Sequence, residues 1–438
     1  MFNVKSKYIK IEQPKVLKGH LIASKISYSA NIEKYFKSDL FYAQYDEDLQ
    51  NVPACILQIP VLSSIITIAW AIGADVYVKE LDKTYLESLN KIKSIMKTWY
   101  PKLPFSTDVC VEYAVSNRFS SQGYGLLFSG GIDSTTSYIR NKKMKPNLIM
   151  IWGADIPLVE EEFWCKVKKK FKDFAKHENV GINFVKTNMR EFINEAVLNT
   201  EFGPYLTGSW WGSFSHGLAL LGICAPATVV KRLGTLLIAA SFDSRIKYPW
   251  GSHWLTDNEL SWAHVKVVND SYELDRQEKI RNVLKDYIRK NKSYPLLRVC
   301  YSQFRDFNCS KCEKCCRTIT GLVLENINPN KCGFNVDKDF FDLLKRNIGE
   351  QTSFIKGEGD VYCWKTIQKH IPETFNHNLY NCKEFFTWFR DFDISRKAKV
   401  RKFNVKWCIS YIYYKLPKNV RKTVIDRLKP IAKFIIHF

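Results

Sequence analysis

The six residues Ser129–Ser134 (SGGIDS) combine two adjacent glycines with hydroxyl side chains and one carboxylate. An apolar run, Tyr124–Phe128, precedes them and predicts a buried strand, and Thr135–Asn141 predicts the start of a helix. A strand, a glycine turn and a helix together direct backbone N–H groups and the positive helix end at one point. Glycine lets the backbone approach an anion closely because it has no side chain. We therefore predict a phosphate or pyrophosphate site, with hydroxyl donors from Ser134 and Thr135.

A second group of residues with chemical potential is a set of cysteines with the spacing C-x8-C-x2-C-x2-C, namely Cys300, Cys309, Cys312 and Cys315. The last three place their sulfurs around one tight turn, and the first can close a tetrahedron from a preceding strand. Four thiolates in this arrangement suit Zn²⁺, and an iron–sulfur cluster is the alternative. Lys311, Lys314 and Arg317 offset part of the negative charge, and Cys316 is a spare thiol that could compete as a ligand.

SGGIDS is not a Walker A loop, because no Gly-Lys-Ser/Thr follows. It resembles the PP-loop of the ATP pyrophosphatase superfamily, whose members split ATP between the α and β phosphates; an ordinary glycine turn is the alternative. Together with the cysteine spacing, it resembles the 7-cyano-7-deazaguanine synthases of the queuosine pathway. Ala239–Pro249 and Arg276–Ile280 loosely resemble two further stretches of that family, and Cys315–Arg317 resembles its closing Cys-x-x-Arg.

The resemblance implies that ATP, with Mg²⁺, binds to the PP-loop residues Ser129, Gly130, Gly131, Ile132, Asp133, Ser134 and Thr135. Asp133 would either hold Mg²⁺ or cap the helix. A carboxylate or amide oxygen of the substrate would attack the α-phosphate, and ammonia would then displace AMP. The implied activity is that of a ligase that forms a C–N bond. Arg276, Lys279 and Arg317 are candidates for binding pyrophosphate, and surface cations or partners of the zinc thiolates are the alternative.

Three further polar residues, Asp243, His253 and Asp257, follow the fourth expected strand in one aromatic loop. Such a loop could cover the acceptor site and supply a catalytic base. The structural alternative is that Asp243 caps a turn and that His253 is a hydrogen-bonded histidine without a catalytic role.

This chain also departs from the family. It adds more than 100 residues at each end, and Tyr248–His253 replaces the family's Tyr-Pro-Asp-Cys-Arg run. We therefore expect this chain to share nucleotide handling and metal binding with the family. Its acceptor substrate stays open and is a small-molecule acid or a deazapurine-like compound.

The length of 438 residues predicts two or three domains, and a hydrophobic content of 46% excludes global disorder. We expect an α/β fold with an N-terminal α/β domain over residues 1–118. A PP-loop domain with a parallel sheet would occupy residues 119–330, and a helical basic region residues 331–438.

Expected elements of the first domain are a strand over Ala54–Ile59, a core helix over Val61–Ile72 and an amphipathic helix over Lys83–Trp99. In the central domain, alternation of strands and helices predicts a parallel sheet covered on both faces. Its five expected strands are Tyr124–Phe128, Asn147–Trp152, Gly181–Lys186, Leu236–Ala240 and His264–Val268.

A net charge of +22 implies an anionic partner, and +10 of it falls in the last 48 residues, with 13 Lys/Arg and 3 Asp. Within this tail, Lys415–Phe438 has helical apolar spacing and predicts a docked helix or contact with a membrane surface or nucleic acid. We expect no membrane span, no signal peptide and a cytoplasmic location. Two alternatives to the ligase stay open: a tRNA-modifying sulfurtransferase, and a nucleotide-binding subunit of an anti-phage or surface-polysaccharide system, assembled with a protein partner.

Overall fold

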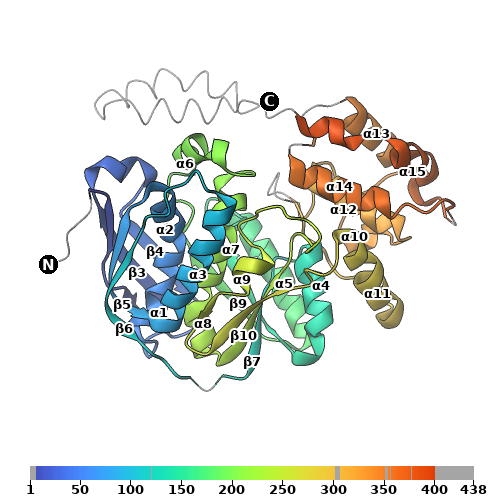
Figure 1. Cartoon of the computed structure of the whole chain (residues 1–438). Coiled ribbons are helices and arrows are strands. Elements are labelled where there is room, and N and C mark those ends of the chain that lie inside the picture. Colours follow the sequence, from blue (N-terminus) through green and yellow to red (C-terminus); the bar gives the residue numbers. More distant parts are fainter. Residues whose placement is uncertain are drawn as a thin grey trace.

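The computed structural model describes residues 6–119, 121–300, 306–350, 354–355, 357–375 and 377–399. These residues form an α/β protein built on one mixed, twelve-stranded sheet, as the sequence predicts at this level (Figure 1). The strands are β1 (Tyr8–Ile11), β2 (Lys15–Leu17), β3 (Leu21–Tyr28), β4 (Leu40–Tyr45), β5 (Asp75–Asp82), β6 (Val109–Val115), β7 (Gly123–Leu127), β8 (Asn147–Trp152), β9 (Ile182–Thr187), β10 (Leu233–Ala239), β11 (Ser261–Trp262) and β12 (Val265–Asp270).

Five neighbouring strands of the sheet are parallel and stand in the spatial order β12-β10-β7-β8-β9. They correspond to the five strands expected for the central region, and β8 has the expected bounds. The first of them in the sequence, β7, lies in the middle. The chain builds outward to β8 and β9 on one side, and then to β10 and β12 on the other. This is the strand order of a doubly wound fold, in which the direction of winding reverses beside the first strand.

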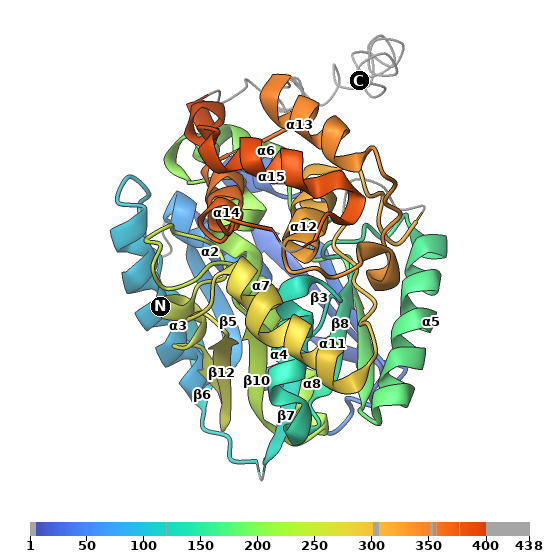
Figure 2. The ribbon, with the colours of Figure 1, turned by 90° about the vertical axis from the view of Figure 1, so that its right-hand side faces the viewer.

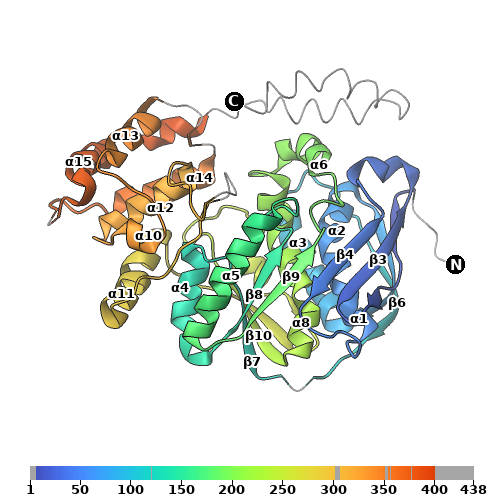
Figure 3. The ribbon, with the colours of Figure 1, turned by 180° about the vertical axis from the view of Figure 1, so that it is seen from behind.

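Helices cover both faces of this parallel segment, and β8 shows why. Leu148 and Met150 pack with α5 (Glu161–Glu178) in one apolar cluster, whereas Ile149 points into the cluster on the other face. Successive side chains of a strand point to opposite faces, so β8 must be apolar throughout. Figure 3 shows α4 (Ile132–Asn141) and α5 on one side of these strands. The second face is covered by α7 (His216–Ile223) and α8 (Ala225–Val230).

The N-terminal strands join this sheet through β4, which pairs antiparallel with β9. Helix α3 has the predicted bounds, Lys83–Trp99, and begins at Asp82, whose carboxylate accepts from the amide of Tyr85. The strand expected over Ala54–Ile59 is wrong, because the chain there forms α1 (Ala54–Leu57) and the start of α2 (Ile59–Ile72). Every residue of α2 is buried, so the apolar run carries no amphipathic period. Pro60 lies in its first turn, where a missing N–H is tolerated.

One helical run, Trp211–Val230, has the length and apolarity of a membrane span, but most of it is buried inside the protein. It consists of a π-helical turn, Trp211–Ser215, followed by α7 and α8. Helix α7 packs against α2, so this run is placed like the core helix of a globular fold. The shorter helices in the middle of the chain are α6 (Glu195–Phe202), α9 (Trp254–Asp257), α10 (Arg276–Glu278) and α11 (Lys285–Asn291), with a π-helical turn at Lys279–Leu284.

The helices after residue 310 form their own apolar cluster with the cysteine residues. They are α12 (Glu313–Leu324), α13 (Phe340–Glu350), α14 (Glu358–Lys369) and α15 (Cys382–Asp391). Figure 2 shows them together at one end of the molecule, above the strands. The predicted helix over Lys415–Phe438 lies outside the described residues.

Candidate functional site

The glycine turn Ser129–Gly131 lies at the carboxyl end of β7, where the winding of the sheet reverses. On one side β7 pairs with β8, the next strand in the chain, and on the other side it pairs with β10. The connections that leave β7 and β10 therefore diverge to opposite faces and open a crevice between them. Ligands of doubly wound sheets bind in this crevice.

Gly130 has the backbone conformation that favours glycine, with φ +75°, and is buried. A Cβ at this position would lie 2.2 Å from Cζ of Phe171, a buried side chain of α5. The turn is held internally by Ser134, whose hydroxyl donates to the Gly131 carbonyl and accepts from the Ser129 amide, both at 3.3 Å. Ser129 itself is exposed. The sequence-predicted turn is thus a fixed structure with one open side.

Helix α4 begins directly after the turn, with Gly131 at its N-cap. The amide of Thr135 donates to the Gly131 carbonyl at 2.9 Å, which is the first bond of the helix. The amides of Ile132, Asp133 and Ser134 come earlier and have no carbonyl one turn behind them inside the helix. The Thr135 hydroxyl is buried and finds no partner among the described residues. This end of α4 therefore offers hydrogen-bond donors and a partial positive charge.

Asp133 bridges two cations that come from a distant part of the chain. Arg276 donates to its Oδ2 at 2.9 Å, and Lys279 lies 3.3 Å from its Oδ1. Lys279 is only 1% exposed and also donates to the Ala240 carbonyl at 2.5 Å. Burial tends to raise the pKa of Asp133, but Arg276 and Lys279 outweigh it and lower that pKa. The carboxylate makes no cap bond to α4. Its two oxygens hold cations, so it does not present a free carboxylate for Mg²⁺.

A cavity of about 180 Å³ opens beside the turn, between the ends of β7, β8 and β10. Ser129, Gly131, Asp133 and Ser134 line it, as does Arg276. The lining also contains residues that the sequence interpretation did not assign to ligand binding, namely Asp155, Arg298 and Lys314. With Lys279 behind Asp133, four cations stand against the two carboxylates Asp133 and Asp155. The charge balance of the cavity favours an anion.

His216 also lines the cavity. Burial lowers the pKa of His216 to about 4, against which the charge of Asp155 acts, so the imidazole is neutral at physiological pH. Its Nδ1 atom has no partner among the described residues. The imidazole is therefore available to a ligand as a neutral donor or acceptor.

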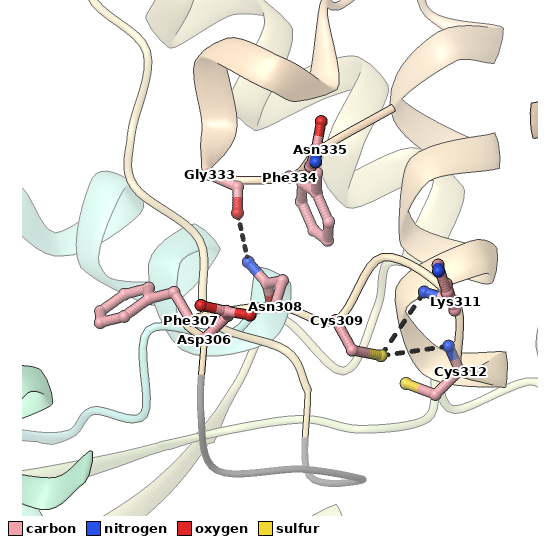
Figure 4. Close-up of a pocket in the computed structure, with 9 residues that line it drawn as sticks. All are labelled: Asp306, Phe307, Asn308, Cys309, Lys311, Cys312, Gly333, Phe334 and Asn335. Carbon is pink, nitrogen blue, oxygen red and sulfur yellow. Dashed lines mark hydrogen bonds between the residues drawn. The ribbon is translucent and has the colours of Figure 1, made fainter. Parts of the chain in front are cut away.

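The four predicted cysteines meet at one point. Their sulfurs all lie within 4.8 Å of one another, with 3.9 Å between Cys300 and Cys312 and 3.9 Å between Cys309 and Cys315. Tetrahedral Zn²⁺ with Zn–S bonds of about 2.3 Å requires sulfurs about 3.8 Å apart. Figure 4 shows the Cys309 sulfur facing the amides of Lys311 and Cys312, which donate to it at 3.4 and 3.2 Å. Such donors stabilise a thiolate, so the cluster fits a metal ion such as zinc.

The spare thiol of Cys316 points elsewhere and donates to the carbonyl of Lys311 at 3.4 Å. It does not compete with the four cysteines. Cys300, by contrast, both belongs to the cluster and lines the anion cavity, so the two predicted sites are adjacent.

The remaining predicted residues do not line the cavity. Buried Asp243 accepts from Tyr362 on α14 and from Arg245 Nε at 2.8 Å. Burial tends to raise the pKa of Asp243, but these bonds lower it. The imidazole of His253 caps α9 by accepting from the Leu255 amide at 3.1 Å, and burial lowers its pKa to about 4.

Asp257 accepts from the Ser252 hydroxyl at 2.7 Å and from the Asn269 side chain at 2.8 Å. Burial raises the pKa of Asp257 to about 7. Arg317 on α12 pairs with Glu313 at 3.3 Å and with Asp360 on α14 at 3.8 Å. These contacts tie loops and helices together. The hydrogen bond of His253 matches the structural alternative weighed for it, whereas Arg317 is buried beside carboxylates and is not a surface cation.

Arg298 and Asp155 were missed at the sequence level. Asp155 follows β8 closely, so its place at the carboxyl end of a parallel strand could have indicated it. Arg298 precedes the first cysteine by two residues, which is a signal only once the cluster is known to stand beside the turn.

Comparison of the chain with protein-family profiles, with curated proteins and with solved structures found no match. The family resemblance therefore rests on the motif residues themselves, and the fold and the site stand on their own geometry.

Proposed function

We propose that this protein is an ATP-dependent adenylating ligase, with a PP-loop domain around β7 and a structural zinc on the four cysteines. The observation that carries the proposal is the position of the glycine turn at the reversal of the parallel strands, open to a cavity of net positive charge. The amides of the turn and the first residues of α4 would hold the polyphosphate of ATP.

In the proposed reaction, a carboxylate oxygen of the acceptor attacks the α-phosphorus of ATP. The bond between the α-phosphorus and the bridging oxygen breaks, and pyrophosphate leaves with both electrons of that bond. Ammonia then attacks the carbonyl carbon, AMP departs, and an amide and a proton are formed. Arg276 and the N-terminus of α4 would stabilise the negative charge on the phosphates, so catalysis is chiefly positioning and electrostatics.

Asp133 has a positioning role in this scheme. Its carboxylate holds Arg276 at the cavity wall and pairs with the buried Lys279 behind it. Because both of its oxygens are engaged, the proposal places no Mg²⁺ on Asp133. Zinc would hold the cysteine segment in place and takes no part in the bond changes.

The test is incubation of the zinc-loaded full chain with radiolabelled ATP, ammonium and a panel of carboxylic acids. We expect equal amounts of AMP and pyrophosphate with an acceptor present. Arg276→Gln should lose this activity. The control Arg281→Gln removes the same charge five residues further along the chain, where the side chain pairs with Glu325 outside the cavity, and should keep the activity. Release of ADP and phosphate would refute the proposal.

Metal analysis of the same sample separates the sulfurtransferase alternative. One zinc per chain and no colour agree with the ligase. Iron, with the absorption of an iron–sulfur cluster, would favour sulfur transfer.

A further inference from the structure

The side chain of Arg298 is buried in the wall of the anion cavity without hydrogen-bond partners for most of its donors. It is 6% exposed, and its Nε and Nη2 atoms contact no acceptor among the described residues. Its guanidinium carbon lies 5.7 Å from the ring centroid of Phe163, which supports the group but accepts no strong hydrogen bond. The charge of Asp155, in the same cavity lining, acts on this guanidinium, but the two nitrogens remain without hydrogen-bond acceptors among the described residues. Buried donors without acceptors are costly, and an oxyanion in the cavity would satisfy them.

The backbone of Arg298 also supports the glycine turn. Its amide donates to the Gly130 carbonyl at 2.7 Å, and its carbonyl oxygen would lie 3.8 Å from a Cβ placed on Gly131. Arg298 and the glycine turn therefore line the same cavity. An oxyanion that accepts hydrogen bonds from the turn would also lie near the guanidinium of Arg298.

The cysteine cluster sets the position of this arginine. Arg298 is two residues before Cys300, and the side chain of Asn308 holds the intervening backbone by accepting from the Val299 amide at 2.9 Å and donating to the Leu297 carbonyl at 2.8 Å. Lys314, a second cation of the cavity lining, lies between Cys312 and Cys315. Two cations of the cavity lining therefore lie within two residues of a cluster cysteine, Arg298 before Cys300 and Lys314 before Cys315.

We infer that Arg298 is an oxyanion-binding residue of this cavity and that the cysteine cluster positions it, so that metal occupancy and anion binding are coupled. The ligand class is a phosphate or pyrophosphate oxyanion, which suits the forked donors of a guanidinium. The inference deepens the proposed function by adding a binding residue and a dependence on metal, but it needs no turnover of ATP.

The first test measures the binding of inorganic pyrophosphate to the zinc-loaded full chain by isothermal titration calorimetry, after dialysis to remove free metal. Arg298→Gln should weaken binding about ten- to a hundredfold, the range for a charge-assisted hydrogen bond. Arg298→Lys keeps the charge but loses the fork, and should fall between. The control is Lys338→Gln, an exposed lysine outside both the cavity and the cysteine motif, which should change affinity less than about twofold.

The second test removes the metal with a chelator, confirms by circular dichroism that the chain stays folded, and repeats the titration. Pyrophosphate should bind at least tenfold more weakly and recover on zinc addition. Linkage requires pyrophosphate to tighten zinc by the same factor, which a competing metal indicator measures. Unchanged pyrophosphate affinity in folded Arg298→Gln, or in folded metal-free protein, overturns the inference. Loss of binding in Lys338→Gln equal to that in Arg298→Gln also overturns it, because the overall positive charge of the protein would then be enough to explain anion binding.

If pyrophosphate binds as expected and ATP is not split, the proposed ligase fails while this inference stands. If AMP and pyrophosphate form normally in Arg298→Gln with unchanged pyrophosphate affinity, the ligase stands and the inference fails.

Discussion

The substitution Gly130→Ala should destabilise the protein through the contact between the glycine turn and α5. Alanine must adopt φ +75°, which costs roughly 1–2 kcal/mol for an L-residue. Its Cβ would also stand 2.2 Å from Cζ of Phe171, when carbon atoms normally approach to about 3.5–4.0 Å. Phe171 is buried against Phe128 at a ring separation of 5.3 Å, so it cannot move freely. Overpacking of this kind costs about 1–3 kcal/mol, which gives a total of roughly 2–5 kcal/mol.

The assay is urea denaturation followed by circular dichroism, with the midpoint and slope compared between variants. Gly131→Ala is the matched control, since its φ is −72° and its nearest neighbour would be the Ser129 hydroxyl at 3.4 Å. It should cost less than about 1 kcal/mol of stability. A double variant, Gly130→Ala with Phe171→Leu, should recover the overpacking part, seen as a coupling free energy of about 1–3 kcal/mol. Equal stability of Gly130→Ala and wild type, or no coupling to position 171, would refute the reasoning.

Three further predictions follow from the ion pairs and the cysteines. Asp133→Asn should lower the free energy of unfolding by about 3 kcal/mol in urea denaturation, because it leaves Lys279 buried without its counter-charge. Since the folded pKa of Asp133 is lowered, its contribution to wild-type stability is present above about pH 4 and is lost as pH falls through the folded pKa. The same loss of stability at acid pH in the variant would contradict this. Cys315→Ser should lower zinc content well below one per chain by mass spectrometry, whereas Cys316→Ser should retain it; equal content in both would show that the four sulfurs are not the ligands. The raised folded pKa of Asp257 makes the free energy of unfolding of the wild type fall as pH rises from about 4 through about 7. Asp257→Asn removes this fall, so the difference in stability between variant and wild type should shift in favour of the variant by about 1–4 kcal/mol from pH 5 to pH 8. A variant with the wild-type pH slope would contradict this.

Local motifs were predictable from the sequence because each is made by neighbouring residues. The turn at Gly130 follows its strand directly, and the last three cysteines span only seven residues. The helix Lys83–Trp99 was predictable because one face is apolar and its N-cap is an aspartate.

The remainder depends on contacts that sequence patterns do not encode. Asp133 meets Arg276 across 143 residues, and no local signal announces that pair. The run Ala54–Ile59 was misassigned because α2 is buried on all sides, which removes the helical period from its sequence. Asp243 and Asp257 looked available for catalysis because their partners, Tyr362 and Asn269, come from other elements. Whether these residues affect activity stays a prediction.

The most direct test of the central claim is a crystal structure of the zinc-loaded protein with α,β-methylene-ATP, an analogue that cannot be split between its α and β phosphates. We predict that phosphate oxygens lie within about 3 Å of amides in Ser129–Ser134, with Arg276 in contact with the same chain of phosphates. A nucleotide bound elsewhere, or an empty glycine turn at a saturating concentration of the analogue, would contradict the account.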